Sequence, residues 1–192
     1  MESRETEEKI LAAAFKVADR YALSGTRMHL IAEEAKLVQS NLHYYFKTKQ
    51  DLLLALLQYI QKYFSETRRS VLEQEQGTLE DGIKGFFQQK KNIILNAPEY
   101  DRVQVDFWRL SQTDERFAEP FYEFFDTWRK DIFQVLKLYA PEIKDSRIWM
   151  ASCVMLSMMM GASLQYLESE EAFDLDDYFE ACLDMIMKHL DS

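Results

Sequence analysis

Turn-forming residues are scarce in this chain, and that scarcity limits its fold more than any other feature. Its 192 residues include only 5 glycines and 3 prolines, about 4% of the chain where roughly 12% is usual. Sandwiches and barrels are disfavoured, because they need a turn signal about every 8–12 residues. The sequence therefore predicts an all-α protein of long helices with few connections.

The acidic residues are concentrated after residue 50. The chain has 23 Lys and Arg, 33 Asp and Glu, and a formal net charge of −10. Residues 1–50 hold 8 basic and 7 acidic residues, whereas residues 51–192 hold 15 and 26. A uniformly acidic protein would bind nucleic acid poorly, but here the head is not acidic. We therefore expect two domains with different partners, residues 1–50 and residues 51–192.

The compartment expected from the sequence is the cytoplasm. Cys153 and Cys182 lie in apolar helical contexts, which is typical of reduced, buried thiols. The N-terminus is charged and lacks the apolar stretch of a secretory signal. Residues 148–167 carry no charge over about the length of a membrane-spanning helix. They include serines, a glutamine and a glycine, so we expect a core helix and no membrane.

Apolar periodicity and capping signals divide the chain into helices. Thr48 opens the fourth helix with a capping box in which Asp51 replaces the usual Glu or Gln, and Thr78 can cap the fifth. Asp114 caps the seventh, which tolerates Pro120 only near its start. The predicted helices span about 6–21, 27–34, 39–45, 48–74, 79–96, 99–111, 114–139, 145–168 and 175–190.

Two short helices joined by a tight turn, at about 27–46, form a helix-turn-helix pattern. The second helix presents hydrogen-bonding side chains on one face, while Leu42, Tyr45 and Phe46 anchor the other. Gln and Asn side chains pair with adenine edges, and Ser pairs with several bases. A solvated polar face is the alternative explanation. The face consists of Gln39, Ser40, Asn41, His43 and Tyr44.

The same stretch resembles the head of TetR/AcrR-type transcriptional repressors. The similarity rests on Ile10-Leu11-Ala12-Ala13-Ala14-Phe15, on Thr26-Arg27-Met28-His29-Leu30-Ile31-Ala32-Glu33-Glu34-Ala35, and on Leu42-His43-Tyr44-Tyr45-Phe46-Lys47-Thr48-Lys49-Gln50-Asp51-Leu52. It implies a three-helix DNA-binding head, a connecting helix at about 48–74, and a helical body that binds a ligand and dimerises.

The resemblance also implies which residues contact DNA. Arg27, Met28 and His29 would touch phosphate, and Lys49 matches the family's phosphate-binding lysine. Gln39, Ser40 and Asn41 would meet base edges. His43 stands where the family usually has a phosphate-contacting tyrosine, Tyr44 follows it, and Lys47 lies just beyond.

Three residues depart from the family pattern. Ala22 replaces a glycine that usually ends the first helix, and Lys36 replaces the glycine of the turn. A left-handed backbone at Lys36 would cost roughly 1 kcal/mol. Val38 stands where Ser or Thr often caps the second motif helix, so about 1 kcal/mol of capping energy is lost. We expect a head that is less rigid but still able to read bases.

The body is rich in aromatic residues and methionine, and most of these are expected to form its core. Apolar pockets between helices are the usual ligand sites, and methionine suits adaptable ones. Asp106 and Gln165 are the best polar groups to orient a ligand. Organic cations, acyl compounds and aromatic compounds are all compatible with these residues. The candidate ligand-binding residues are Phe107, Trp108, Trp128, Met159, Gln165 and Tyr166.

The last two helices are expected to pair with their copies across a two-fold axis. The uncharged helix is apolar around its whole circumference, which one core cannot cover. One side carries Trp149, Cys153, Leu156, Met160 and Leu164. Ser157 and Gly161 are small and four residues apart, which permits close helix approach, and the final helix has a similar apolar stripe. The sequence therefore predicts a homodimer held by a four-helix bundle.

Two other classes of function fit the sequence less well. An enzyme is disfavoured, because the three histidines form no cluster with metal-ligand spacing and no phosphate-binding loop or nucleophile elbow is present. No cofactor or metal is expected. A helical adaptor that has lost DNA binding would lack the steep salt dependence of a DNA-binding protein. We therefore expect a ligand-responsive transcriptional regulator, a repressor that binds a palindromic DNA operator as a dimer and is released by a small-molecule effector.

Overall fold

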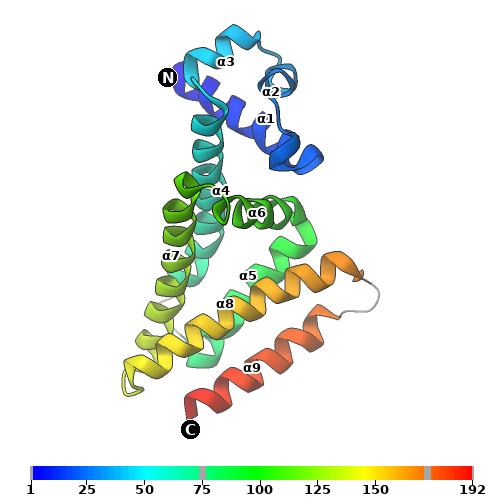
Figure 1. Ribbon diagram of the computed structural model, residues 1–192. Coiled ribbons are helices and arrows are strands. Elements are labelled where there is room, and N and C mark those ends of the chain that lie inside the picture. Colours follow the sequence, from blue (N-terminus) through cyan, green and yellow to red (C-terminus); the bar gives the residue numbers. More distant parts are fainter. Residues whose placement is uncertain (1, 74–76, 171–173, 192) are drawn as a thin grey trace. The chain divides into compact units, whose positions relative to one another are not determined.

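The computed structural model describes residues 2–73, 77–170 and 174–191. This part of the chain contains nine α-helices and no strand, which confirms the all-α prediction (Figure 1). The helices are α1 (Glu2–Gly25), α2 (Met28–Glu34), α3 (Gln39–Tyr45), α4 (Lys49–Leu72), α5 (Leu79–Asn96), α6 (Pro98–Ser111), α7 (Glu115–Tyr139), α8 (Asp145–Glu168) and α9 (Leu175–Asp191).

The helices divide into two compact units. The first contains residues 1–64 and 99–121, and the second contains residues 65–98 and 122–192. The division falls inside α4 and inside α7, so α6 belongs to the same unit as α1, α2 and α3. The domain boundary at residue 50 stays a prediction.

Side-chain caps determine where several helices begin. The Thr48 hydroxyl accepts a hydrogen bond from the Asp51 N–H at 3.1 Å, and the Asp51 carboxylate accepts one from the Thr48 N–H at 2.9 Å. Thr78 and Asp81 form the same reciprocal box at α5, and these hydrogen bonds from Thr78 lower the pKa of the Asp81 carboxyl. Both predicted caps are confirmed. The predicted end of α4 at residue 74 lies outside the described residues.

The head is held together by apolar side chains from four helices. Ile10 and Ala14 of α1, Ile31 of α2 and Leu42 of α3 are completely buried, and Leu52 of α4 joins them. Ion pairs add to the contact between α1 and α2, because the Lys16 ammonium and the Arg20 guanidinium both lie within 4 Å of the Glu34 carboxylate. This packing fixes α3 while leaving its other face to solvent.

Two residues that replace the family's glycines have positive φ angles. Ala22 has φ 56° and ψ 166°, and it interrupts the regular geometry of α1. Lys36 has φ 55° in the turn after α2. The region that Ala22 occupies is open almost only to glycine, and a side chain there costs about 1–3 kcal/mol. Val38 is the N-cap of α3 and makes no side-chain capping bond.

Ala22→Gly is expected to stabilise the protein by about 1 kcal/mol, because relief of strain exceeds the added entropy of the unfolded chain. For a chain of this size that corresponds to a rise in melting temperature of about 2–4 °C at fixed protein concentration. Ala12→Gly, in the regular part of α1, is the matched control and should lower stability by roughly 0.5–1 kcal/mol. Equal destabilisation by both substitutions would contradict the strain at Ala22.

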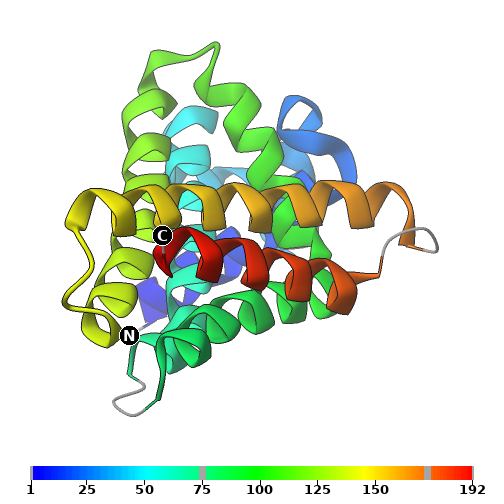
Figure 2. The same cartoon turned by 90° about the horizontal axis from the view of Figure 1, so that it is seen from below.

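The second unit is built around α8 and α9, which lie side by side (Figures 1 and 2). The Tyr178 hydroxyl donates to the Met158 carbonyl at 2.9 Å and ties the two helices together. By length and apolarity α8 could cross a membrane. However, Ile148, Ala151, Met155 and other residues along it are buried inside the unit, as expected for a core helix.

Candidate DNA-binding interface

The turn between α2 and α3 closes with a pair of backbone hydrogen bonds. The Leu37 N–H donates to the Ala32 carbonyl at 2.9 Å, and the Lys36 N–H donates to the Glu33 carbonyl at 3.0 Å. This is the Schellman arrangement, which requires a left-handed residue at the position of Lys36. The positive φ of Lys36 therefore follows from the turn itself, and the turn sets the direction in which α3 leaves α2.

The face of α3 expected to read bases is open to solvent. Leu42 is completely buried and Phe46 nearly so, and these two side chains anchor the helix to the head. The five polar residues of the face are all exposed, and Tyr44 reaches 72% exposure. The structure thus brings together all five predicted side chains on one accessible surface: Gln39, Ser40, Asn41, His43 and Tyr44.

The predicted phosphate-contacting residues differ in how free their side chains are. Arg27, His29 and Lys47 are exposed, whereas Met28 and Lys49 are half-buried. The Lys47 ammonium lies 6.0 Å from the centre of the Tyr44 ring, at the outer limit of a cation–π contact. Lys47 is therefore an exposed cation directly beyond α3, whereas Lys49 is partly covered.

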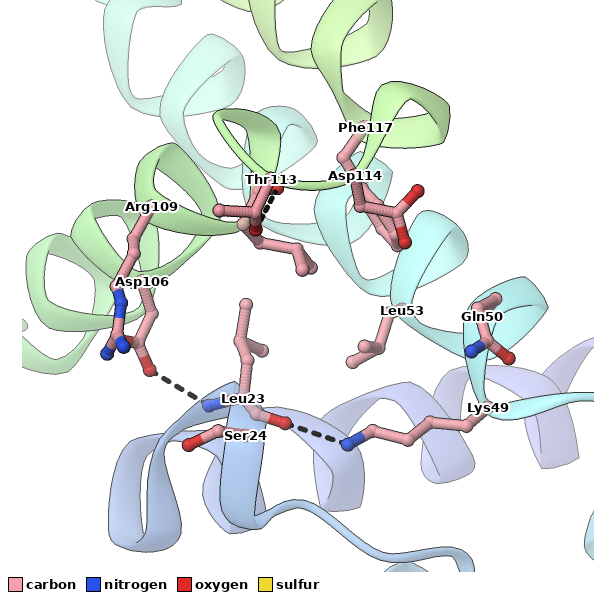
Figure 3. A pocket seen from close by; sticks show the side chains of 11 residues that line it. Leu23, Ser24, Lys49, Gln50, Leu53, Asp106, Arg109, Thr113, Asp114 and Phe117 are labelled. Carbon is pink, nitrogen blue, oxygen red and sulfur yellow. Dashed lines mark hydrogen bonds between the residues drawn. The ribbon is translucent and has the colours of Figure 1, made fainter.

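Lys49 is attached to the end of α1. Its ammonium donates to the Leu23 carbonyl at 2.9 Å, and the Leu23 N–H donates to the Asp106 carboxylate at 2.8 Å. Figure 3 shows Leu23 between these two side chains, at the edge of a cavity of about 270 Å³ that also reaches Arg109 and Phe117. Burial, and then the nearby positive charge of Arg27, lower the pKa of the Lys49 ammonium.

Asp106 makes a contact that the sequence did not suggest. Its carboxylate accepts a hydrogen bond from the backbone of α1, at the edge of the same cavity. Its role in orienting a ligand stays a prediction. The contact spans 83 positions in sequence, so no local pattern could have revealed it.

The six candidate ligand-binding residues fall in different surroundings. Phe107 and Trp108 belong to the first unit and the other four to the second. Trp128 and Met159 are completely buried, as is Phe107, but Trp108 and Gln165 are exposed and Tyr166 is half-buried. Their role in binding a ligand stays a prediction.

Two buried cations of the second unit were missed by the sequence reasoning. Arg68 and Lys90 are completely buried, and they lie 5.3 Å and 5.6 Å from the Trp128 ring centre. The Arg68 Nε donates to the Asp131 carboxylate at 3.0 Å, while burial lowers the pKa of the guanidinium. A signal was present, because Lys90 continues the apolar stripe of Ile83, Phe86 and Phe87 at helical spacing.

Comparison with known families agrees with this geometry. The family described as "Bacterial regulatory proteins, tetR family" matches residues 10–56, which include α2, α3 and the start of α4. The head of the chain therefore matches the TetR family. Members of the matched family are transcription regulators, which confirms the expectation that this chain is not an enzyme.

Solved structures of transcriptional regulators share the fold along nearly the whole chain. A TetR transcription regulator from Haloarcula marismortui is 18% identical, with a TM-score of 0.80 over 98% of this chain and 97% of that one. A regulator from Saccharomonospora viridis in complex with choline is 18% identical, with a TM-score of 0.83 over 96% of each chain. FadR from Bacillus subtilis in complex with stearoyl-CoA is 15% identical, with a TM-score of 0.76 over 93% and 96%. The search of curated proteins finds no match.

Proposed function

We propose that this TetR-family protein is a homodimeric repressor that binds a near-palindromic operator and is released by a small-molecule effector. The observation that carries the proposal is the exposed polar face of α3, anchored beneath by Leu42 and Phe46. A helix of this kind reads base edges in the major groove. Two copies related by a two-fold axis would occupy half-sites one helical turn apart, roughly 34–36 Å.

An exposed apolar stripe on α8 supports the dimer. Met150, Val154 and Leu164 are exposed, and Ser157 and Gly161 lie between them at alternating spacings of four and three. The small central residues permit close approach of a second helix, while the larger ones at the ends supply apolar area. Ser157 and Gly161 are the small pair that the sequence indicated for close helix approach, whereas Leu156 is buried inside the unit.

The surroundings of Trp128 favour an effector with an anionic group. The similar structures bind ligands as different as choline and stearoyl-CoA, so the shared fold does not select among them. Two buried cations, Arg68 and Lys90, already lie against the Trp128 ring. Asp131 pairs with the Arg68 Nε, but the buried Arg68 Nη1 has no hydrogen-bond partner among the described residues. A carboxylate or phosphate could accept a hydrogen bond from it, which a quaternary amine cannot do. We therefore expect acyl or other anionic compounds rather than quaternary amines.

Selection from a random pool of duplexes tests the proposal. We expect the recovered sequences to be near-palindromes, and we expect long-chain acyl-CoA to release the protein from them while raising its melting temperature. Choline at the same concentration should do neither. By reciprocity, operator DNA should weaken acyl-CoA binding by the same factor. Recovered sequences without two-fold symmetry would contradict the dimeric operator, and release by choline would contradict the anionic class.

A further inference from the structure

The turn that follows α1 holds two cations side by side. The Leu23 carbonyl accepts a hydrogen bond from the Lys49 ammonium at 2.9 Å. The Ser24 and Thr26 carbonyls accept hydrogen bonds from the Arg27 guanidinium at 2.6 Å and 3.1 Å. Neither cation has exhausted its donors, since an ammonium has three and a guanidinium has five. Two neighbouring positive charges are unfavourable alone but suit a phosphate that contacts both.

The same turn is tied to α6 from its other side. The Asp106 carboxylate accepts a hydrogen bond from the Leu23 N–H at 2.8 Å. The preceding residue, Ala22, is in a strained backbone conformation, and such conformations persist only where surrounding contacts enforce them. Asp106 and the Thr26 hydroxyl, which donates to the Ala22 carbonyl at 2.9 Å, supply those contacts. The carbonyls that hold Arg27 and Lys49 thus depend on a carboxylate that does not itself face DNA.

We infer that Asp106 is a positioning residue for DNA binding, which acts by fixing the Leu23 backbone and through it the Lys49 ammonium. The inference rests on the proposed function, because it assigns Lys49 to a DNA phosphate. It also gives α6 a direct connection to the DNA-contacting end of the head, within the first unit.

Other contacts between α6 and α1 supply a control. The Arg102 guanidinium donates a hydrogen bond to the Asp19 carboxylate at 2.7 Å, and the centres of the Phe15 and Tyr100 rings are 4.4 Å apart. These contacts join the same two helices as Asp106 does but do not involve the turn. Arg102→Ala therefore weakens the attachment of α6 without moving the carbonyl that holds Lys49.

The experiment measures affinity for a mixed-sequence duplex of about 30 base pairs as a function of salt. Each phosphate contact contributes about 0.9 to the slope of log affinity against log salt. For a dimer, Asp106→Ala should lower the slope by about two and the affinity about tenfold or more at low salt. Asp106→Asn retains an oxygen acceptor for the Leu23 N–H, so it should keep the wild-type slope, as should Arg102→Ala.

A double-mutant cycle separates this role from a general loss of stability. In a Lys49→Ala background, Asp106→Ala should cause no further loss of slope, because both changes remove the same phosphate contact. The inference would be overturned if the two substitutions lowered the salt slope additively in the double variant. It would also be overturned if Asp106→Ala alone kept the wild-type slope. A slope lowered equally by Asp106→Asn and Asp106→Ala would also overturn it, since the hydrogen bond would then be irrelevant. Failure of the wild-type chain to bind any duplex would instead refute the proposed function.

Discussion

Leu164→Glu is expected to convert the dimer to a monomer and to lower operator affinity by about 10²–10⁴-fold. Leu164 is 52% exposed in the single chain, so the substitution leaves the protomer folded. In the proposed interface the new carboxylate would be buried twice, once for each copy, without a partner. Separate heads then lose the high effective concentration that a dimer provides for the second half-site.

Leu138→Glu on α7 is the matched control for this prediction. Leu138 is 62% exposed and receives the same charge, but it lies on a different helix from the apolar stripe. Sedimentation at micromolar concentration, paired with an operator-binding measurement, distinguishes the variants. We expect Leu138→Glu to remain dimeric and to bind normally. A wild-type chain that sediments as a monomer would disprove the dimer and leave the exposed face of α8 unexplained.

Asn41→Ala is expected to relax sequence preference while leaving non-specific affinity nearly unchanged. Asn41 is exposed at the centre of the α3 face, where its amide can make a paired hydrogen bond to an adenine edge. One such contact is worth about 1–3 kcal/mol of discrimination, and therefore about 2–6 kcal/mol over the two half-sites of a dimer. The measured quantity is the ratio of affinities for the selected operator and for a scrambled duplex, at two salt concentrations.

Lys47→Ala provides the contrast. Lys47 is exposed beside α3, and a phosphate contact carries no sequence information, so its loss should weaken binding to both duplexes equally and reduce the salt slope. It is a cleaner probe than Lys49, whose ammonium also satisfies the Leu23 carbonyl. Identical behaviour of Asn41→Ala and Lys47→Ala would show that α3 does not read bases.

Local chemistry determined most of the secondary structure, and the sequence alone was sufficient to predict it. Thr48 and Thr78 begin helices because their hydroxyls and the carboxylates three residues later satisfy backbone N–H groups. Pro98 lies at the first position of α6, where its missing N–H costs nothing. The positive φ of Lys36 also followed from position in a turn. All these signals act within a few residues of one another, which is why they can be read from the sequence.

The candidate DNA-binding face was equally predictable, since helical spacing alone separates the buried anchor Leu42 from exposed Asn41 and Tyr44. The positions of charged side chains in the rest of the chain could not be predicted in this way. The Asp106 carboxylate accepts a hydrogen bond from α1 that the sequence did not suggest, and the donor, the Leu23 N–H, is 83 residues away. Hydrogen bonds over such separations depend on how the helices pack, and periodicity carries no information about the partner.

Tertiary packing also decided which side of α8 is covered. Because α8 is apolar around its circumference, its sequence could not distinguish the buried side from the exposed one. The Tyr178 hydroxyl of α9 donates a hydrogen bond to the Met158 carbonyl, and packing around α8 buries Leu156 while leaving Met150 and Val154 exposed. The sequence by itself determined the helices, most of their ends and the polar face of α3, although α1, predicted at about 6–21, spans Glu2–Gly25. Only the tertiary structure decided which apolar surface remains uncovered and which carboxylate holds the end of α1, because both depend on neighbours distant along the chain.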